Sequence, residues 1–362
     1  MEVQIIKDRQ LWNDFVAASQ HCNIMQSYEW GELVSSIGAE EVMRIGVVDM
    51  DGKLCAAMLT EITRVPVLKQ VYFYVPRGPI LDDPNSPALT MLLNFMKAEA
   101  RRRHAFMLKL EPGVLDDNNE WLAALKRRGF HINPNHMNVR NEWVLDIRPD
   151  EKTLLANMKE KWRYNIRLAA RKGVTIRRGE GADDIDAFYR LYQTTSERDF
   201  FAINQKSFYE TVLRLFGVGG HAALFLAEYE GQAISAIITI TLGPWCWYMY
   251  GASSNEQREK MPNHLLQWTA IQWAREQGCH YYNFRGIPEI LEEGQEMWGI
   301  YLFKRGFGGS AMHFLATHDL VYQPLIYTAY RKLLDLKHWR DTRRQMRIVT
   351  QNPVMPASKS KV

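Results

Sequence analysis

An internal repeat constrains the fold of this chain more than any other feature of its sequence, because the same patterns recur 176 to 179 residues apart. The first is an acidic-glycine turn between two apolar runs, at residues 47–59 and 226–238, which indicates a β-hairpin. An aromatic strand, VYFYVP or WYMYGA, follows each hairpin. Solenoid repeats are only about 20–50 residues long, so this spacing indicates a duplicated domain.

Both halves continue with the same helix and strand pattern. A proline opens a helix after each aromatic strand, at Pro87 and Pro262, where its missing N–H group would have no helical partner. A strand follows each helix, AFMLKLEP in the first half and HYYNFRGIP in the second. Each half is then expected to have a last helix, which ends in the similar segments LKRRGF (125–130) and LFKRGF (302–307). The chain therefore predicts two copies of one unit.

The repeated unit predicts a mixed α/β fold, because hairpins need antiparallel neighbours and disfavour a purely parallel sheet. The order of elements resembles acyl-CoA N-acyltransferase (GNAT) domains, so we expect two tandem GNAT-like domains. We place the first at residues 1–147 and the second at 148–317. A basic C-terminal helical extension, 318–362, is expected to pack back on the first domain. The basic helix near 151–172 would begin the second domain, after the strand EWVLDI.

Composition excludes several classes of protein. The 362 residues are 46% hydrophobic and 24% charged, which are values of a globular chain rather than a disordered one. The four cysteines include no C-x-x-C pair, so they predict neither a disulfide framework nor a zinc site, and we expect no metal. The charged start MEVQIIKDRQ is unlike a signal peptide, and no apolar run reaches the ~18 residues of a membrane span. We expect a cytoplasmic protein.

Two segments concentrate positive charge. Residues 159–178 contain eight Lys or Arg side chains and one acid, and residues 330–347 are basic with interleaved leucine and tryptophan. Such helices suit a polyanion such as RNA or an anionic membrane surface. A solvated helix face is the alternative. The candidate RNA-binding cations of the first segment are Lys159, Lys161, Arg163, Arg167 and Arg171.

Several sequence segments resemble motifs of the Fem family of non-ribosomal peptidyltransferases. They are QSYEWGEL, KWRYNIRLAARKGV, SERDFF, WYMYGASS, MPNHLLQWTAIQWAREQGCHYYNF and YLFKRGFGG, of which the last two are the most specific. This family moves amino acids from aminoacyl-tRNA to the stem peptide of peptidoglycan precursors. No sustained heptad run corresponds to the coiled-coil arm of larger members, so the chain is similar to compact FemX-type members. The resemblance implies an aminoacyltransferase of cell-wall synthesis, with aminoacyl-tRNA as co-substrate and no cofactor.

The resemblance also implies a reaction centre at Phe303 and Lys304, within YLFKRGFGG. In this family the Phe–Lys pair lies where the amine attacks, and the lysine polarises the ester carbonyl or stabilises its charge. Loss of one such preorganised group costs about 100-fold or more in rate. A lysine at a helix C-terminus is also favoured by the helix dipole without any catalytic role.

Further residues match positions that contact substrate in the family. They are Glu111, Phe106, Tyr250, Arg198 and Asp199. Glu111 and Phe106 would border the acceptor, and a carboxylate can hold or deprotonate the attacking ammonium. Tyr250 matches a tyrosine that contacts the acceptor, although core packing also explains an aromatic residue in a strand. Arg198 and Asp199 match a frequent ERDGF turn, for which ordering of the turn is the alternative.

Departures from the family pattern concern the acceptor. Members that use a UDP-linked precursor often carry a lysine shortly after the Trp-Gly motif and an arginine after ERDGF, and both cations suit a pyrophosphate. Val34 and Ser35 stand in the first place, and Asn204 stands near the second, with Lys206 as a substitute. Phe200 replaces the glycine of ERDGF. The acceptor could therefore be UDP-linked, lipid-linked or another amine.

Three functions remain compatible with the sequence. The first is aminoacyl transfer from tRNA to an amine of a peptidoglycan precursor, by a monomer that touches the inner membrane face peripherally through its C-terminal helix. The second is an acyl-CoA-dependent N-acyltransferase acting on a small amine, although PRGPILDDPNSP and GASSNEQREKMPNH lack the glycines of a pyrophosphate cradle. The third is a nucleic-acid-binding protein on a degenerate transferase fold, against which FKRGFGG argues.

Overall fold

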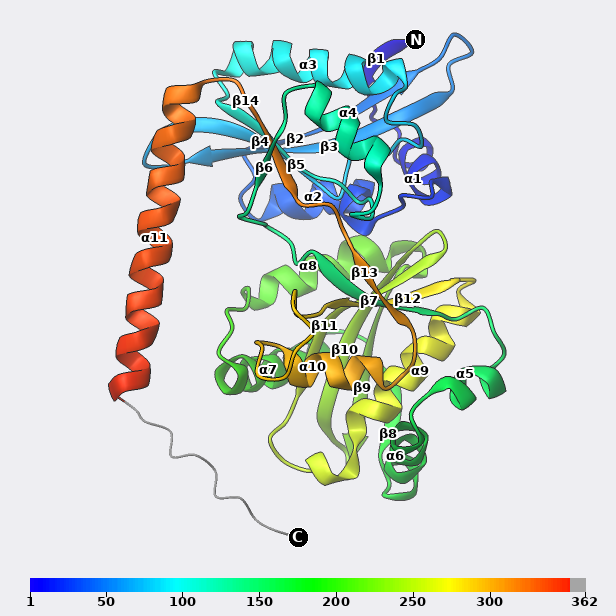
Figure 1. Ribbon diagram of the computed structural model, residues 1–362. Coiled ribbons are helices and arrows are strands. Elements are labelled where there is room, and N and C mark those ends of the chain that lie inside the picture. The colour runs from blue at the N-terminus through cyan, green and yellow to red at the C-terminus, as the bar shows by residue number, and fades with distance from the viewer. Residues whose placement is uncertain (352–362) are drawn as a thin grey trace.

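Two mixed β-sheets with helices on their faces are stacked along the long axis of the protein (Figure 1). The computed structural model describes residues 1–351, and within its last helix it describes no side chain at 337, 338 or 341–351. Residues 352–362 of the predicted extension lie outside the described part. Within that part each sheet has seven strands, and the mixed α/β class is confirmed.

The first sheet has the order β1-β2-β3-β4-β5-β14-β6. Its strands are β1 (Glu2–Ile5), β2 (Glu41–Val48), β3 (Leu54–Val65), β4 (Gln70–Pro76), β5 (Met107–Glu111), β14 (Thr317–Val321) and β6 (His131–Asn133). The predicted hairpin is confirmed by antiparallel β2 and β3, and β4 runs parallel to β5. The helices of this part are α1 (Arg9–Ala18), α2 (Tyr28–Ser36), α3 (Pro87–Arg103) and α4 (Asn119–Arg127), with a short 3₁₀ helix η1 (Ile24–Gln26).

The second sheet has the order β13-β7-β12-β11-β10-β9-β8. Its strands are β13 (Ser310–His313), β7 (Asn141–Asp146), β12 (Tyr281–Gly286), β11 (Trp245–Ser253), β10 (Gln232–Leu242), β9 (Ala222–Tyr229) and β8 (Thr175–Arg178). Its helices are α5 (Glu151–Asn157), α6 (Glu160–Arg171), α7 (Ala182–Asp199), α8 (Lys206–Gly217), α9 (Pro262–Glu276) and α10 (Trp298–Arg305). Here too the predicted hairpin, β9–β10, is antiparallel, and β11 runs parallel to β12.

The two hairpin turns show how closely the copies agree. Gly52 and Gly231 both have φ +77°, a left-handed conformation that costs glycine little. Pro87 and Pro262 occupy the first helical position of α3 and α9, as predicted. Local sequence signals therefore specify the same local structure in both halves.

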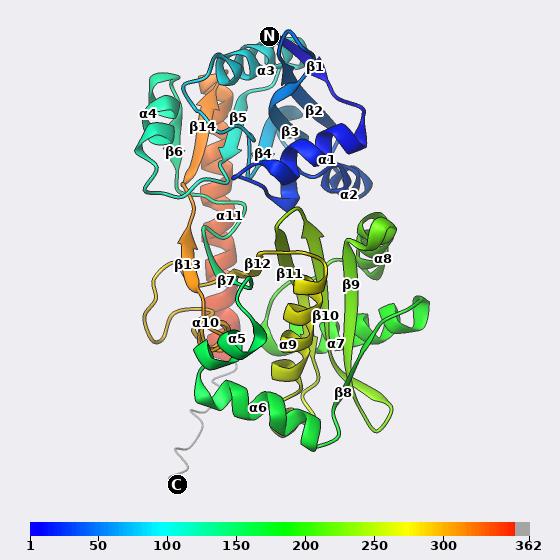
Figure 2. The ribbon, with the colours of Figure 1, turned by 90° about the vertical axis from the view of Figure 1, so that its right-hand side faces the viewer.

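The sheets exchange one strand each, which the repeat does not predict. The strand β7, expected to end the first unit, pairs with β12 and β13 of the second sheet. The strand β14 fills the corresponding place between β5 and β6 of the first sheet. Figure 2 shows β13 and β14 following one another from the lower to the upper sheet. Because of this exchange, dividing the chain at residue 147 does not separate the strands of the two sheets. The division into domains stays a prediction.

Two further expectations about elements are corrected. The extension from residue 318 begins in β14 rather than in a helix, because the first sheet needs a strand where β7 has left it. The helix expected near 151–172 is broken into α5 and α6 at Met158 and Lys159. Lys159 has a non-helical backbone with ψ 141°, and its N–H group donates to the carbonyl oxygen of Gly306, 2.9 Å away. That bond takes Lys159 out of the helical path.

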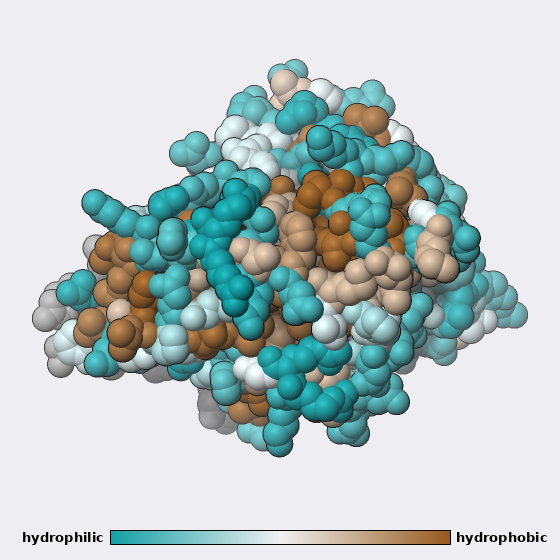
Figure 3. Space-filling model, turned by 90° about the horizontal axis from the view of Figure 1, so that it is seen from above, coloured by the Kyte–Doolittle hydropathy of each residue, from teal (hydrophilic) through white to brown (hydrophobic). Residues whose placement is uncertain are grey.

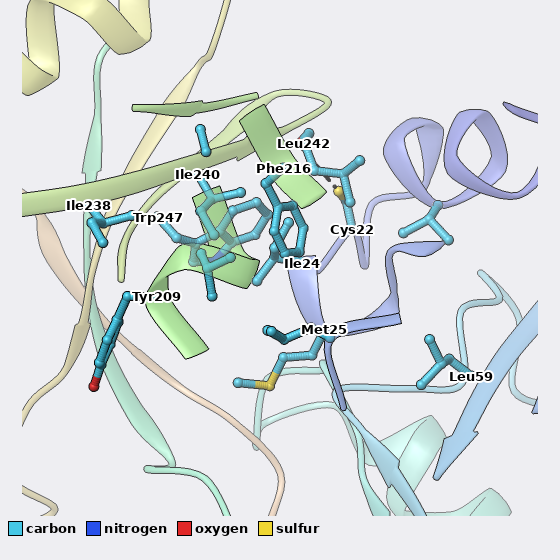
Figure 4. Close-up of a cluster of buried hydrophobic side chains, with 14 of the residues drawn as sticks. Cys22, Ile24, Met25, Leu59, Tyr209, Phe216, Ile238, Ile240, Leu242 and Trp247 are labelled. Atoms are coloured by element: carbon cyan, nitrogen blue, oxygen red, sulfur yellow. Dashed lines mark hydrogen bonds between the residues drawn. The ribbon is translucent and has the colours of Figure 1, made fainter. Parts of the chain in front are cut away.

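A shared hydrophobic core joins the two halves (Figure 4). Ile24 and Met25 of η1 pack with Phe216 of α8 and with Trp247 of the second sheet. Each of these four side chains is at most 3% exposed. Truncating such a residue to alanine costs about 2–5 kcal/mol, so this contact holds the two halves together.

The C-terminal helix α11 (Pro324–Gln351) starts on the first sheet and runs beside the second half (Figure 1). Tyr330 packs against Tyr72 and Phe106 of the first half. Seen from above, the surface is mainly hydrophilic with separate apolar patches (Figure 3). Among residues 1–351, no helix combines the length and apolarity needed to cross a membrane.

Candidate active site

Lys304 lies in the last turn of α10 with its side chain inside the protein. The residue is 5% exposed, whereas Arg127, its counterpart 177 residues earlier, is exposed. Its ammonium donates a hydrogen bond to the carbonyl oxygen of Gly286, at the end of β12. Burial, assisted by Arg285 and opposed by Glu142, lowers the pKa of Lys304 to about 7. The second copy thus holds a buried lysine where the first has a surface cation.

A buried carboxylate, Glu142 of β7, collects donors from both sheets. It accepts hydrogen bonds from Asn283 at 2.6 Å, Arg285 at 3.0 Å and Arg77 at 3.2 Å. Arg77 directly follows β4 of the first sheet, so this ion pair crosses between the halves. Burial by itself raises the pKa of Glu142, but Arg285, Arg77 and the Asn283 hydrogen bond together lower it. Glu142 is therefore a buried anion at neutral pH.

Arg285 connects the groups of this region. Its side chain is 21% exposed, and its backbone has φ +64°, the left-handed region. The side-chain oxygen of Asn283 accepts a hydrogen bond from the Arg285 amide at 2.7 Å. The positive charge of Arg285 lowers the pKa of Lys304 and opposes the rise in the pKa of Tyr250. Two residues predicted for the site, Lys304 and Tyr250, therefore both lie within range of the charge of Arg285.

Phe303 lies on an aromatic wall beside Lys304. Its ring meets that of His264 edge-on at 5.2 Å and that of Phe307 at 5.3 Å. The indole N–H of Trp162 donates to the Phe303 carbonyl oxygen at 2.9 Å. Burial, assisted by the charge of Lys161, lowers the pKa of His264 to about 4, so its imidazole is neutral at pH 7. This wall packs aromatic rings against Phe303, the residue that directly precedes Lys304.

Tyr250 belongs to a second aromatic group, built by α7, α8 and β11. Its ring packs edge-on against Tyr209 at 5.2 Å and Phe208 at 5.9 Å. Burial and the neighbouring Tyr209 raise the pKa of Tyr250 above its usual value, so its hydroxyl keeps its proton. Packing alone can thus account for an aromatic residue at this position, and contact with an acceptor stays a prediction.

Arg198 and Asp199 end α7 close to the end of β11. The Arg198 guanidinium pairs with Asp199 at 2.9 Å and donates to the carbonyl oxygen of Ser253 at 3.1 Å. It also reaches the side chain of Asn255 at 3.0 Å. These bonds order the turn, as the alternative interpretation expects, and contact with substrate is untested.

In the first half, Glu111 is the last residue of β5, and Phe106 directly precedes that strand. Glu111 is 3% exposed and accepts hydrogen bonds from four residues: Tyr74, Met137, Asn138 and Thr317. Burial alone would raise the pKa of Glu111, but these four donors lower it instead. Phe106 is fully buried against Tyr72 and the ring of Tyr330. Neither side chain lies beside Lys304 in this arrangement, and their predicted contact with the acceptor is untested.

The residues at the places of the family's pyrophosphate-binding cations offer little free positive charge. Val34 is 8% exposed, and the Ser35 hydroxyl donates to the carbonyl oxygen of Gly31 within α2. The backbone N–H group of Asn204 donates to the Tyr209 hydroxyl. Lys206 forms ion pairs with Asp186 at 2.7 Å and with Glu210 at 3.4 Å. Phe200, in place of the family glycine, is 92% exposed.

The five cations predicted to bind tRNA lie on or beside α6, and four are exposed. The exposed ones are Lys159, Lys161, Arg167 and Arg171. Arg163 is instead half-buried and donates to three carbonyl oxygens at the end of α5. The exposed face of α6 therefore carries the charge, while Arg163 holds the break between α5 and α6 together.

The glycines of YLFKRGFGG have a packing role that can be tested separately from chemistry. Gly309 has φ +89°, and a Cβ there would meet the backbone carbonyl of Val144 in β7. We expect Gly309→Ala to destabilise the protein by about 2 kcal/mol, through backbone strain and overlap. Gly299→Ala is the matched control, because nothing lies near that position in α10 and alanine favours a helix. Urea unfolding of both variants measures the difference, and equal stability would contradict this role.

Arg77, Glu142 and Arg285 belong to this region but were not predicted from the sequence. A signal was present in HYYNFRGIP, where Asn283 and Arg285 interrupt an aromatic strand. The role of Asn283 and Arg285 depends on their bonds to Glu142, which lies 143 residues before Arg285 in the sequence. Those bonds require the exchange of β7, which local patterns do not reveal.

A sequence model of the FemAB family matches residues 8–233 and 227–334, so the chain belongs to the FemAB family. A curated relative, the lipid II:glycine glycyltransferase of Staphylococcus aureus (strain MRSA252), is 24% identical over 387 residues. That alignment covers 86% of this chain and 91% of the relative. The predicted family resemblance is confirmed, and with it the class of enzyme, an aminoacyltransferase.

Solved structures support the fold. A structure described as the crystal structure of FemX matches with a TM-score of 0.85 at 24% identity, over 91% of this chain and 99% of that one. A tandem GNAT protein from the clavulanic acid biosynthesis pathway matches with a TM-score of 0.52 at 11% identity, over 88% and 98%. The prediction of two GNAT-like units is confirmed.

Proposed function

We propose that this protein transfers an amino acid from aminoacyl-tRNA to an amine of a peptidoglycan precursor. The observation that carries the proposal is Lys304, a buried lysine beside Arg285 and the aromatic wall of Phe303. A group of cations in a partly dry site suits a reaction that develops negative charge on oxygen. The proposal needs no cofactor besides the aminoacyl-tRNA.

In the proposed reaction, the unprotonated amine of the acceptor attacks the ester carbonyl carbon of the aminoacyl-tRNA. The new C–N bond forms as the π electrons move to the carbonyl oxygen, which the ammonium of Lys304 stabilises. The C–O bond to the ribose then breaks, and the ribose oxygen takes up the proton that the amine nitrogen loses. The products are an amide and a free tRNA 3′ end.

The favoured acceptor is a lipid-linked muramyl peptide. The curated relatives are named lipid II:glycine glycyltransferases. Val34 and Ser35 supply no cation, and Lys206 is already paired with two acids. A soluble UDP-linked precursor would present a pyrophosphate that calls for cations at these places. Work at a lipid-linked substrate would place the protein in the cytoplasm at the inner membrane face, and a monomer suffices for the proposed chemistry.

The exposed face of α6 is the proposed tRNA surface. We expect Lys161→Gln with Arg167→Gln to weaken tRNA binding and to reduce the slope of log K against log salt by about 2. The control is Lys97→Gln with Arg101→Gln on the exposed side of α3, which should leave that slope unchanged. Filter binding over a salt series measures it, and identical slopes for both double variants would argue against this surface.

A competition between donors tests the reaction class. The enzyme receives ³H-labelled aminoacyl-tRNA and ¹⁴C-labelled acetyl-CoA together, with a muramyl peptide as acceptor. Tritium alone in the peptide supports the proposal. Carbon-14 in the peptide would contradict it and indicate an acyl-CoA-dependent N-acyltransferase on the same fold.

A further inference from the structure

We infer that Arg285 is a second cation of the reaction centre, which binds the negatively charged oxygen together with Lys304. We infer also that Glu142 is a positioning residue that holds Arg285 in place. The inference rests on the proposed function, because it assigns groups to the same transfer step.

The backbone at the end of β12 brings the two cations together. The Lys304 ammonium donates to the carbonyl oxygen of Gly286, the residue that directly follows Arg285. Glu142 holds one nitrogen of the Arg285 guanidinium, Nη1, at 3.0 Å. Among the side chains that the structure describes, none accepts a hydrogen bond from its Nε or Nη2, and the side chain is 21% exposed. Arg285 can therefore donate to a bound group while it stays anchored.

The charges near Lys304 leave an excess of positive charge. The charged groups are Arg285 of β12, Glu142 of β7 and, beyond Glu142, Arg77 after β4. With Lys304 protonated, three cations face one carboxylate. Arg77 is 2% exposed, its Nη2 donates to both Glu142 and the Val139 carbonyl, and its guanidinium lies over the Phe314 ring, so it is buried in the structure and faces no substrate. The excess charge at Arg285 and Lys304 suits an anionic oxygen.

The backbone of Arg285 is held in an unfavourable conformation by specific bonds. A residue with a side chain adopts φ +64° only at a cost in energy. Asn283 holds this turn, since its oxygen accepts from the Arg285 amide and its nitrogen donates to Glu142 at 2.6 Å. Arg77 already pairs with Glu142 from the side of the first sheet. The charge of Glu142 therefore does not by itself require Arg285 to adopt this unfavourable turn. The turn lies directly before Gly286, whose carbonyl anchors Lys304, and it lets the guanidinium reach Glu142.

The test compares Arg285→Gln, Arg285→Lys and Glu142→Gln with the control Arg148→Gln, whose side chain is 55% exposed. We expect Arg285→Gln to lower kcat of the folded enzyme about 100-fold, with KM for aminoacyl-tRNA little changed. Tm falls, because the buried Glu142 loses one of its three donors. Arg285→Lys restores part of kcat, because an ammonium supplies charge but not the fork of donors. Glu142→Gln lowers kcat by a smaller factor, since Arg285 remains but is less firmly held.

The pH dependence of kcat separates positioning from general damage. A required Lys304 ammonium makes activity fall as pH rises through its pKa of about 7. Glu142 raises that pKa and Arg285 lowers it. Glu142→Gln should therefore move the alkaline decline to lower pH, and Arg285→Gln should move it to higher pH.

The outcomes discriminate between the inference and the function on which it rests. Wild-type kcat in Arg285→Gln would overturn the inference while leaving the proposed function intact. Shifts of the alkaline decline in the same direction for both variants would overturn the positioning role. A wild-type enzyme that transfers nothing would overturn both. If Glu142→Gln fails to fold, the Arg285 variants still decide the matter.

Discussion

Replacing Lys304 with methionine is expected to lower kcat about 100-fold or more without lowering Tm. The ammonium is the group assigned to the developing charge, and methionine cannot replace it. Methionine has a similar volume, and removing a buried charge removes its desolvation cost. The measurement pairs kcat of aminoacyl transfer with a thermal unfolding curve.

Arg305→Gln is the matched control, because Arg305 is the next cation of α10 and is exposed. We expect its kcat within about twofold of wild type, as for surface substitutions generally. Full activity in Lys304→Met would contradict the assignment of the site. A loss of activity that tracks a loss of folded protein would contradict it equally.

Replacing Glu111 with alanine is expected to destabilise the protein by about 3 kcal/mol or more. Tyr74, Asn138 and Thr317 would lose a buried charged acceptor, as would the Met137 amide. Because the pKa of Glu111 is lowered in the folded protein, its contribution is present above the ordinary value of 4.5 and is lost as pH falls below it. The variant should therefore lose less stability on acidification. Urea unfolding at pH 7 and at pH 4 measures both effects.

Glu289→Ala is the control for Glu111, since Glu289 is 64% exposed and forms a surface pair with Arg140. We expect a change of about 0.5 kcal/mol or less. The comparison also separates two roles of Glu111. A stable Glu111→Ala variant with a large loss of kcat would contradict the structural interpretation and favour contact with the acceptor. A destabilised variant whose folded fraction keeps wild-type kcat would support the structural role.

The sequence predicted those features that local patterns encode. Hairpins, the proline-opened helices α3 and α9, and Lys304 in the last turn of α10 all follow from spacing within a few residues. The exchange of β7 and β14 was not predictable in this way, because an apolar strand carries no mark of the sheet that it joins. The partner depends on which edge is vacant in the folded protein.

The same limit applied to the candidate site. Lys304 was found by resemblance, but its burial depends on Gly286 and Glu142, which lie far away in the sequence. In the sequence, Arg285 is one polar residue in the segment HYYNFRGIP, and only its pairing with the distant Glu142 sets it apart. Glu111 was an isolated acid before a proline in the sequence, and its four donors come from β4, from residues 137–138 and from β14. Long-range hydrogen bonds are what a linear pattern omits.

The most direct test of the central claim is the mass of the acceptor. Purified enzyme is incubated with a pool of charged tRNAs and, in separate reactions, with lipid-linked or UDP-linked muramyl pentapeptide. We expect a mass gain equal to one amino acid residue on the lipid-linked peptide, and this gain should disappear when the tRNA is deacylated beforehand. An unchanged mass on both acceptors, from an enzyme that is folded and binds tRNA, would contradict it.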